Sequence, residues 1–451
     1  MNSNGDEGNR LSRRDFLGKA GAAAVGAGLA ARALAVHSEP TRSAKTPGPN
    51  DKIVFGLIGC GGMGSANMKS FMGHPDVDVA AICDVDDDRM PGDFAEIKKK
   101  YGRAPAVYKD YRKMLEQRDI DAVIIGTPDH WHALNLIHAC EAGKDSYCEK
   151  PISHNIEEAV AMAGAARRFK RVVQVGTWQR STREFTDAIA YVRSGKLGKV
   201  THCRAWIADG TRIGKRKPET PPSNLDFPFW IGPAELVPYQ SNRVHWNWRW
   251  VMNTGGGLTT DWGVHMMDIA LLGMSKDQDL VMPKEVYSCG GQWAITDDDR
   301  DAPDTIEALL RFEDPDFVMT WSVLRDHPGK PGHCTEFVGA NGRTVRVWRG
   351  GWQVLDADGK ELPKEQAPPA GDHWRDFLDC VKSRGMPRAG LASVAQTTIV
   401  CHLVNAALYA NQSVRWDKAR MDIVGRAGKQ TLAYSRPYRK PWKLVRYPWN
   451  G

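Results

Sequence analysis

The sequence lacks several patterns that mark common functional classes. Its nine cysteines are scattered and never form a CxxC pair, so neither a zinc ribbon nor a disulfide scaffold is expected. It has no long lysine and arginine run and no basic helix interleaved with aromatic residues, which argues against nucleic acid despite the net charge of +7. After residue 35 no uninterrupted apolar run of about 18 residues follows, so no stable membrane span is expected.

The 451 residues are more than one hydrophobic core usually serves, so two domains are expected. The first 35 residues differ from the rest. Arg13 and Arg14 precede an Ala/Gly-rich run and then Ala33-Leu34-Ala35, a small-x-small cleavage site. This order resembles a twin-arginine export signal, which predicts export to the periplasm; the alternative is a short amphipathic cytosolic arm.

A buried parallel strand is predicted at residues 52–58, which are apolar after Lys52. It leads into Gly59-Cys60-Gly61-Gly62-Met63-Gly64, and a helix is predicted at residues 65–72. A GxGxxG pattern between a strand and a helix lets backbone N–H groups face a pyrophosphate. We therefore assign a dinucleotide site to Gly59, Gly61, Gly62, Met63 and Gly64.

Asp84 follows a second predicted strand, residues 77–83, and lies twenty residues after Gly64. At this position a carboxylate accepts both ribose hydroxyls of an adenosine, which favours NAD over NADP. Because Arg89 lies near Asp84 in sequence and could accommodate a 2'-phosphate, NADP is the alternative cofactor. The alternative interpretation of Asp84 is a turn residue without a role in binding.

Two more buried strands are predicted at residues 121–126 and 145–148. Loops at the carboxyl ends of parallel strands face the ligand. Five residues in or just after these loops are expected near the nicotinamide: Thr127, Pro128, His132, Glu149 and Lys150.

Period-two segments at residues 201–208, 285–293, 305–312 and 317–324 predict an antiparallel sheet. Residues 209–254 form a long insert rich in proline and tryptophan, which could stack on a sugar ring or pack over the sheet. Helices are expected at residues 374–382 and 391–410. The fold class is thus an α/β Rossmann domain followed by an α+β domain.

These motifs, with Gly255-Gly256-Gly257 and Asp261-Trp262-Gly263-Val264-His265, resemble the glucose-fructose oxidoreductase, inositol dehydrogenase and MocA (Gfo/Idh/MocA) family over about residues 51–412. The resemblance implies a Rossmann domain, a substrate domain with an open, mostly antiparallel sheet, and dimers or tetramers formed through that sheet. It also implies that Lys150, Asp261 and His265 line the reaction site. We predict a signal peptide at 1–35, a linker at 36–50, an NAD-binding domain at 51–172, a substrate and oligomerisation domain at 173–412, and a tail at 413–451.

A single helix after the glycine run would place Asp261, His265 and Asp268 on one face. Imidazole suits the role of proton acceptor near neutral pH, so His265 is the predicted base. Lys150 is expected to stabilise alkoxide character, and Asp261 to hold a hydroxyl and orient His265. A capping aspartate and a core histidine would show the same spacing, and no third ligand accompanies Asp261 and His265, so no metal site is assigned.

Arg180, Arg249 and Trp262 are candidate substrate contacts, although either arginine could pair with a surface carboxylate. Because free NAD is scarce outside the cytoplasm, an exported enzyme is expected to hold NAD tightly and reset it in each cycle. We expect an oxidoreductase acting on a secondary hydroxyl of a sugar or polyol. The alternatives are a glycosidase that oxidises its sugar transiently, and a sugar-binding protein without catalysis.

Overall fold

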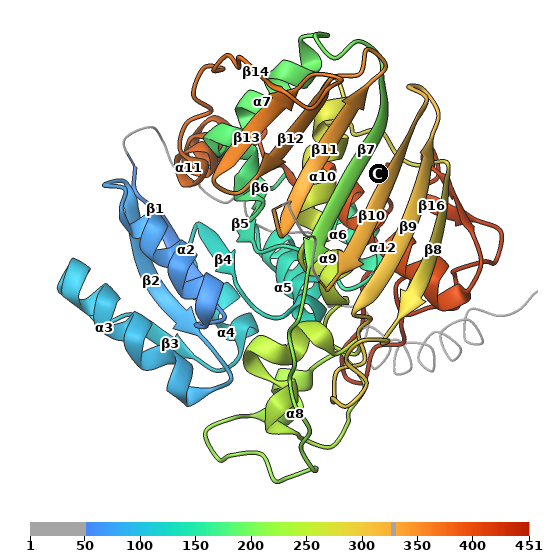
Figure 1. The fold of residues 1–451 in the computed structure, drawn as a ribbon. Coiled ribbons are helices and arrows are strands. Elements are labelled where there is room, and N and C mark those ends of the chain that lie inside the picture. The colour runs from blue at the N-terminus through green and yellow to red at the C-terminus, as the bar shows by residue number, and fades with distance from the viewer. Residues whose placement is uncertain (1–50, 326–330, 451) are drawn as a thin grey trace, which may run out of the picture. The chain divides into compact units, whose positions relative to one another are not determined.

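The chain is built on two β-sheets, as a computed structural model shows for residues 51–325 and 331–450 (Figure 1). The predicted leader and linker lie outside these described residues. One sheet has six strands and the other has ten. The predicted fold class, a Rossmann domain followed by a domain with a mostly antiparallel sheet, is confirmed.

The six-stranded sheet is parallel, with strand order β3-β2-β1-β4-β5-β6. Every residue of β4 and β5 is buried, as expected for strands covered on both faces. The order changes direction between β1 and β4, so the loops after these strands open at one edge, where doubly wound sheets bind ligands. The strands are β1 (Ile53–Ile58), β2 (Val77–Cys83), β3 (Ala106–Tyr108), β4 (Ala122–Ile125), β5 (Asp145–Cys148) and β6 (Val173–Val175).

Short polar residues and glycines set the ends of the helices in this domain. The side chain of Asp110 accepts a hydrogen bond from Arg112 N at the start of α4, and that of Asn155 accepts one from Glu158 N at the start of α6. Gly102 ends α3 in the left-handed conformation. The helices are α2 (Gly62–Met72), α3 (Met90–Tyr101), α4 (Tyr111–Leu115), α5 (Asp129–Glu141) and α6 (Ile156–Arg168).

The ten-stranded sheet has the order β14-β13-β12-β11-β7-β10-β9-β8-β15-β16. Only β7 and β10 pair in parallel; all other neighbours are antiparallel. Buried and exposed residues alternate along β9, so one face of the sheet is covered. Helices α10 and α12 pack against this sheet, behind it in Figure 1.

The strands of this sheet are β7 (Val200–Ala208), β8 (Glu285–Gly291), β9 (Thr305–Phe312), β10 (Phe317–Leu324), β11 (His333–Gly339), β12 (Thr344–Trp348), β13 (Gly351–Leu355), β14 (Glu361–Leu362), β15 (Val414–Asp417) and β16 (Asp422–Val424). The helices that accompany it are α7 (Arg183–Arg193), α8 (Phe227–Ile231), α9 (Gly257–Asp261), α10 (Gly263–Met274), α11 (His373–Ser383) and α12 (Leu391–Ala410). The predicted tail at 413–451 thus begins with β15 and β16, which extend the sheet.

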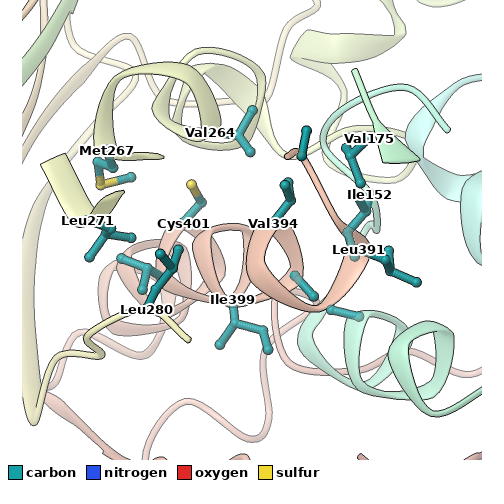
Figure 2. Packing of buried hydrophobic residues seen from close by; sticks show 14 of the residues in the cluster. Ile152, Val175, Val264, Met267, Leu271, Leu280, Leu391, Val394, Ile399 and Cys401 are labelled. Atoms are coloured by element: carbon teal, nitrogen blue, oxygen red, sulfur yellow. The ribbon is translucent and has the colours of Figure 1, made fainter. Parts of the chain in front are cut away.

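Helix α12 lies at the centre of a core that both domains share (Figure 2). Val394 and Cys401 on α12 belong to the same buried cluster as Val264 on α10 and Val175 of the first domain. By length and composition α12 could cross a membrane, but 89% of its most apolar window is buried inside the protein. Its apolar surface therefore serves the core. Eight of the nine cysteines are buried, and Cys289 is exposed.

Candidate active site

The glycine loop between β1 and α2 is shaped by backbones in close contact. A Cβ at Gly64 would lie 2.0 Å from the Gly59 carbonyl oxygen, and one at Gly126 would lie 2.5 Å from the Gly64 Cα. Gly59 has φ of +90°, a conformation that side chains disfavour. These glycines therefore allow β1, α2 and the loop after β4 to cross closely. Helix α2 begins at Gly62, three residues before the predicted start, so the loop is tighter than expected.

The outer side of the loop opens onto a cavity. Gly61, Gly62 and Met63 line this cavity, and no atom lies within 4 Å of a Cβ added at Gly62. The first turn of α2 carries no acidic residue, so its free N–H groups favour an anion. This cradle fits the pyrophosphate of a dinucleotide. Gly64 does not line the cavity; its contact with Gly59 shapes the loop instead.

Asp84 directly follows β2 and lines the same cavity. Its carboxylate accepts hydrogen bonds from Cys60 N (2.7 Å) and Asp86 N (2.9 Å). Burial raises the pKa of Asp84, and these two hydrogen bonds oppose the rise. Asp84 thus holds the glycine loop while facing the cavity. Arg89 also lines the cavity. The carboxylate that favours NAD and the guanidinium that could bind the 2'-phosphate of NADP therefore both face it.

The loops after β4 and β5 bring four of the predicted residues to the cavity: Thr127, Pro128, Glu149 and Lys150. His132 does not line it. Its two ring nitrogens lie 2.7 Å from the carbonyl oxygens of Thr127 and Pro151, so His132 joins the two loops.

Glu149 is buried and held in place by Asn67, whose Nδ2 donates to Oε1 over 2.7 Å. Burial raises the pKa of Glu149, and the charge of Lys150 opposes the rise.

Lys150, Asp261 and Arg249 form an ion cluster at the end of the cavity. Lys150 Nζ donates to Asp261 Oδ1 over 2.7 Å, and Arg249 Nε donates to the same oxygen over 3.2 Å. Their side chains are only 12–14% exposed. Burial alone would raise the pKa of Asp261, but the two cations outweigh it and lower that pKa. Asp261 is therefore a carboxylate that holds the Lys150 side chain at the cavity wall.

The single helix predicted to carry Asp261, His265 and Asp268 is interrupted at Trp262. Asp261 is the last residue of α9, and α10 begins at Gly263. The carboxylate of Asp261 is bonded to Lys150 and Arg249, and no hydrogen bond joins it to His265 among the residues described.

Arg180 is not brought to the cavity. Its guanidinium forms a buried, two-pronged ion pair with Asp268, at 2.6 and 2.7 Å, and also donates to Ser393 Oγ over 2.9 Å. Both side chains are at most 2% exposed. The pair joins the segment after β6 to α10 and α12, so Arg180 and Asp268 hold these elements together.

His265 is 4% exposed and does not line the cavity. Its Nδ1 is buried and has no hydrogen-bond partner among residues 51–325 and 331–450. Burial, and then the charges of Lys150 and Arg349, hold the pKa of His265 well below its usual value. The imidazole is therefore neutral, as a proton acceptor has to be.

Four side chains surround His265, and the sequence patterns singled out only Trp262. The ring centroids of Trp178 and Trp262 lie 6.4 and 5.9 Å from that of His265. Arg349 stacks between these two indoles, at 4.8 and 4.3 Å from their centroids, and His333 packs against Trp262 at 4.9 Å. No local motif marks Arg349 or His333, because the ten-stranded sheet alone brings them here.

Two family models match the chain in consecutive segments. Residues 53–177 match the NAD-binding Rossmann fold of the Gfo/Idh/MocA oxidoreductase family, and residues 202–444 match its C-terminal alpha/beta domain. The chain belongs to the Gfo/Idh/MocA family. The expectation from the sequence motifs is thus confirmed at the level of the family.

Relatives of this Gfo/Idh/MocA protein include both glycosidases and oxidoreductases. The chain is 30% identical over 210 residues to an alpha-N-acetylgalactosaminidase of Shewanella oneidensis, a match that covers 43% of the chain and 45% of that protein. It is 28% identical over 239 residues to an uncharacterised oxidoreductase of Bacillus subtilis, covering 53% of the chain and 57% of the relative. The chain thus spans about half the length of these curated relatives.

Among solved structures, levoglucosan dehydrogenase in complex with NADH and levoglucosan shares the fold. Its TM-score is 0.61 at 21% identity, covering 81% of this chain and 99% of that one.

The insert at residues 209–254 supplies part of the cavity wall and is attached to the loop that follows β2 and Asp84. Asn224 Nδ2 donates to Asp86 Oδ1 over 2.8 Å and to Asp88 Oδ2 over 3.0 Å. Leu225 forms a β-bridge with Asp86, and His245 Nε2 lies 3.5 Å from Asp86 Oδ2. The insert leaves the second domain at β7, yet it is fastened to the loop after β2.

A C-terminal strap, residues 436–449, holds the other side of the insert. Trp442 stacks on Phe229 of α8 with centroids 5.4 Å apart, and packs edge-on against Trp131 at 4.7 Å. Phe229 and Trp131 both line the cavity. Arg439 Nε donates to the Gly232 carbonyl oxygen over 2.9 Å. The strap therefore supports the cavity wall from behind.

Proposed function

We propose that this protein is an NAD-dependent enzyme that oxidises a secondary hydroxyl of a sugar or polyol. The observation that carries the proposal is Lys150 at the wall of the cavity that the dinucleotide cradle also lines, fixed by Asp261 and near enough that its charge adds to burial in lowering the pKa of His265. This combines a cation and a proton acceptor beside a nucleotide site, which is what removing hydrogen from an alcohol requires.

Each of the site residues has a separate role in the proposed reaction. His265 takes the hydroxyl proton, and Lys150 stabilises the negative charge that then develops on the oxygen. Bound NAD would supply the oxidising power by accepting two electrons with the hydrogen of the same carbon. Asp261 keeps Lys150 in place, and Arg249, stacked between Trp246 and Trp248 at the cavity, holds the substrate.

A redox-neutral glycosidase is the second candidate, favoured by the similarity to the alpha-N-acetylgalactosaminidase. In that reaction the oxidised carbon acidifies the neighbouring C–H bond, loss of that proton expels the aglycone, and water adds in its place. Reduction of the carbon then restores the starting redox state, so the net change is hydrolysis. A sugar-binding protein without catalysis ranks third, because Lys150, Asp261 and His265 are all present.

We also propose that NAD remains bound between turnovers and that the enzyme is exported by the twin-arginine route. Two observations support retention: the insert is fastened to Asp86, and the strap backs the cavity wall. The paired Arg13 and Arg14 support export by the twin-arginine route, which carries proteins that are already folded and have bound their cofactor.

We propose that the protein forms a homodimer or homotetramer through the large sheet. Tyr287 and Leu309 on its outer face are 46% and 44% exposed, which favours an interface there.

The function is tested with purified protein in two steps. Heat denaturation followed by chromatography should release NAD; no released nucleotide, together with no binding of added NAD, contradicts the retained cofactor. The holo-protein is then incubated with p-nitrophenyl glycosides and free sugars. Accumulation of NADH supports a dissociable dehydrogenase, and nitrophenol release without net NADH supports the glycosidase. If no sugar reduces the bound NAD and no glycoside releases nitrophenol, both are contradicted.

A further inference from the structure

A second group of side chains adjoins His265 on the side of the large sheet. We call Trp178, Trp262, His333 and Arg349 the Arg349 cluster. Trp178 follows β6, Trp262 separates α9 from α10, His333 begins β11, and Arg349 lies in the turn between β12 and β13. Trp178, Trp262 and His333 are half-buried, as is Arg349, so the cluster is open to solvent on one side while it contacts His265.

Arg349 is oriented but has no acidic partner. Its Nε donates to Gln179 Oε1 over 3.1 Å, and its backbone N–H donates to His333 Nε2 over 3.2 Å. Within residues 51–325 and 331–450 no carboxylate oxygen lies within 4.0 Å of its guanidinium. The guanidinium carbon lies 4.8 Å from the Trp178 ring centroid and 4.3 Å from that of Trp262. Among the residues described, Nε donates to Gln179 and no hydrogen bond from Nη1 or Nη2 is seen, so these donors are available to a ligand.

Besides burial, two cations, Lys150 and Arg349, act on His265 and lower its pKa. Lys150 forms an ion pair with Asp261, whereas Arg349 has no ion-pair partner among the residues described. Burial lowers the pKa of Arg349, with Asp261 opposing from a distance, so its cation is incompletely compensated. A half-buried guanidinium with free in-plane donors is a strong binding site for a carboxylate or a phosphate oxygen pair.

We propose that Arg349 binds an anionic group on the substrate, so that the enzyme acts on an acidic sugar. A carboxylate, phosphate or sulfate ester would meet the guanidinium while a neighbouring hydroxyl lies against Lys150 and His265. Trp262 offers its ring edge to the sugar between these two points. This inference rests on the proposed function for the hydroxyl chemistry, but not for the binding of the anion.

The test measures binding of paired acidic and neutral sugars to the holo-protein by calorimetry. The pairs are D-glucuronate with D-glucose and D-galacturonate with D-galactose, and glucose 6-phosphate separates a phosphate from a carboxylate. We expect at least one acidic sugar to bind more tightly than its neutral partner. Arg349→Gln should weaken that binding about 10- to 100-fold and leave neutral sugars unchanged, because it removes a charge-assisted, two-pronged contact.

Two further variants keep the test decisive. Arg349→Lys keeps the positive charge but loses the planar pair of N–H donors, so its affinity for the acidic sugar should lie between those of wild type and Arg349→Gln. If Arg349→Gln does not unfold cooperatively on heating, Arg349→Lys is used in its place. Arg343→Gln removes the same charge from the turn before β12, where Arg343 Nη1 donates to the Lys196 carbonyl oxygen, and should change nothing. Equal affinity for acidic and neutral sugars, or an equal loss for both in Arg349→Gln, overturns the proposal, as does binding of none of the acidic sugars.

The same samples separate this inference from the proposed function. Binding of an acidic sugar that depends on Arg349, without reduction of the bound NAD by any sugar, would support the anion site and contradict the oxidation. Reduction of the bound NAD by neutral sugars, with no acidic sugar bound more tightly than its neutral partner, would support the oxidation and contradict the anion site.

Discussion

The fastening of the insert to the first domain can be tested with one substitution, Asn224→Ala. This change removes both hydrogen bonds from Asn224 to the carboxylates of Asp86 and Asp88, at 2.8 and 3.0 Å. Hydrogen bonds to charged groups contribute about 1.5–3 kcal/mol each when buried. Because these are half-buried or exposed, we discount the pair to about 1–2 kcal/mol in total.

A loss of that size raises the open fraction of the insert about 5- to 30-fold. If the insert retains the cofactor, the rate of NAD release should rise by the same factor. The assay loads the protein with NAD, adds an excess of a competing analogue, and follows the loss of bound NAD over time. Asn253→Ala is the matched control, because among the residues described the Asn253 side chain bonds only to Glu235, within the insert. Equal release rates in wild type, Asn224→Ala and Asn253→Ala would refute this role of the insert.

Four other outcomes are expected. Lys150→Ala should lower kcat by about 10²- to 10⁴-fold with NAD still bound, since it removes charge stabilisation rather than the cradle; an unchanged kcat contradicts the site. Because the pKa of His265 is lowered, the ring stays neutral as pH falls through 6.5, so kcat/KM should decline only at more acidic pH, and a decline centred at 6.5 or above contradicts the assignment of His265 as base. Trp442→Ala should lower the free energy of unfolding by about 2 kcal/mol and speed NAD release, measured by denaturant titration and the release assay; unchanged values contradict the strap's role. Replacing Arg13 and Arg14 by lysine should keep the protein in the cytoplasm, and periplasmic recovery of that variant in cell fractions contradicts twin-arginine export.

Much of the first domain could be predicted because its signals are local. The strand at residues 77–83 coincides with β2, since a short segment that is apolar apart from Asp78 and lies between turns is typical of a buried strand. The glycine loop could be assigned because a backbone that turns and approaches a helix closely requires glycine at fixed spacings. The period-two segment at residues 305–312 coincides with β9 for a similar reason.

The helix after Gly257 shows where local reasoning fails. Spacing alone predicted one helix with Asp261 and His265 on a common face, but the helix is interrupted at Trp262. In the fold, Asp261 turns to Lys150 and Arg249, and the Trp262 indole covers Arg349. Tertiary ion pairs and stacking have outweighed helix propensity at this point.

The sequence by itself determined the nucleotide loop, the order of the domains and the residue types available for chemistry, because each of these depends on neighbours along the chain. The tertiary structure alone decided the partners. Lys150 pairs with Asp261, 111 residues away in sequence, and Asn224 bonds the insert to Asp86. Arg349, in the turn between β12 and β13, packs on Trp262 beside His265. Such contacts join side chains with no relation in sequence, so no periodicity or spacing encodes them.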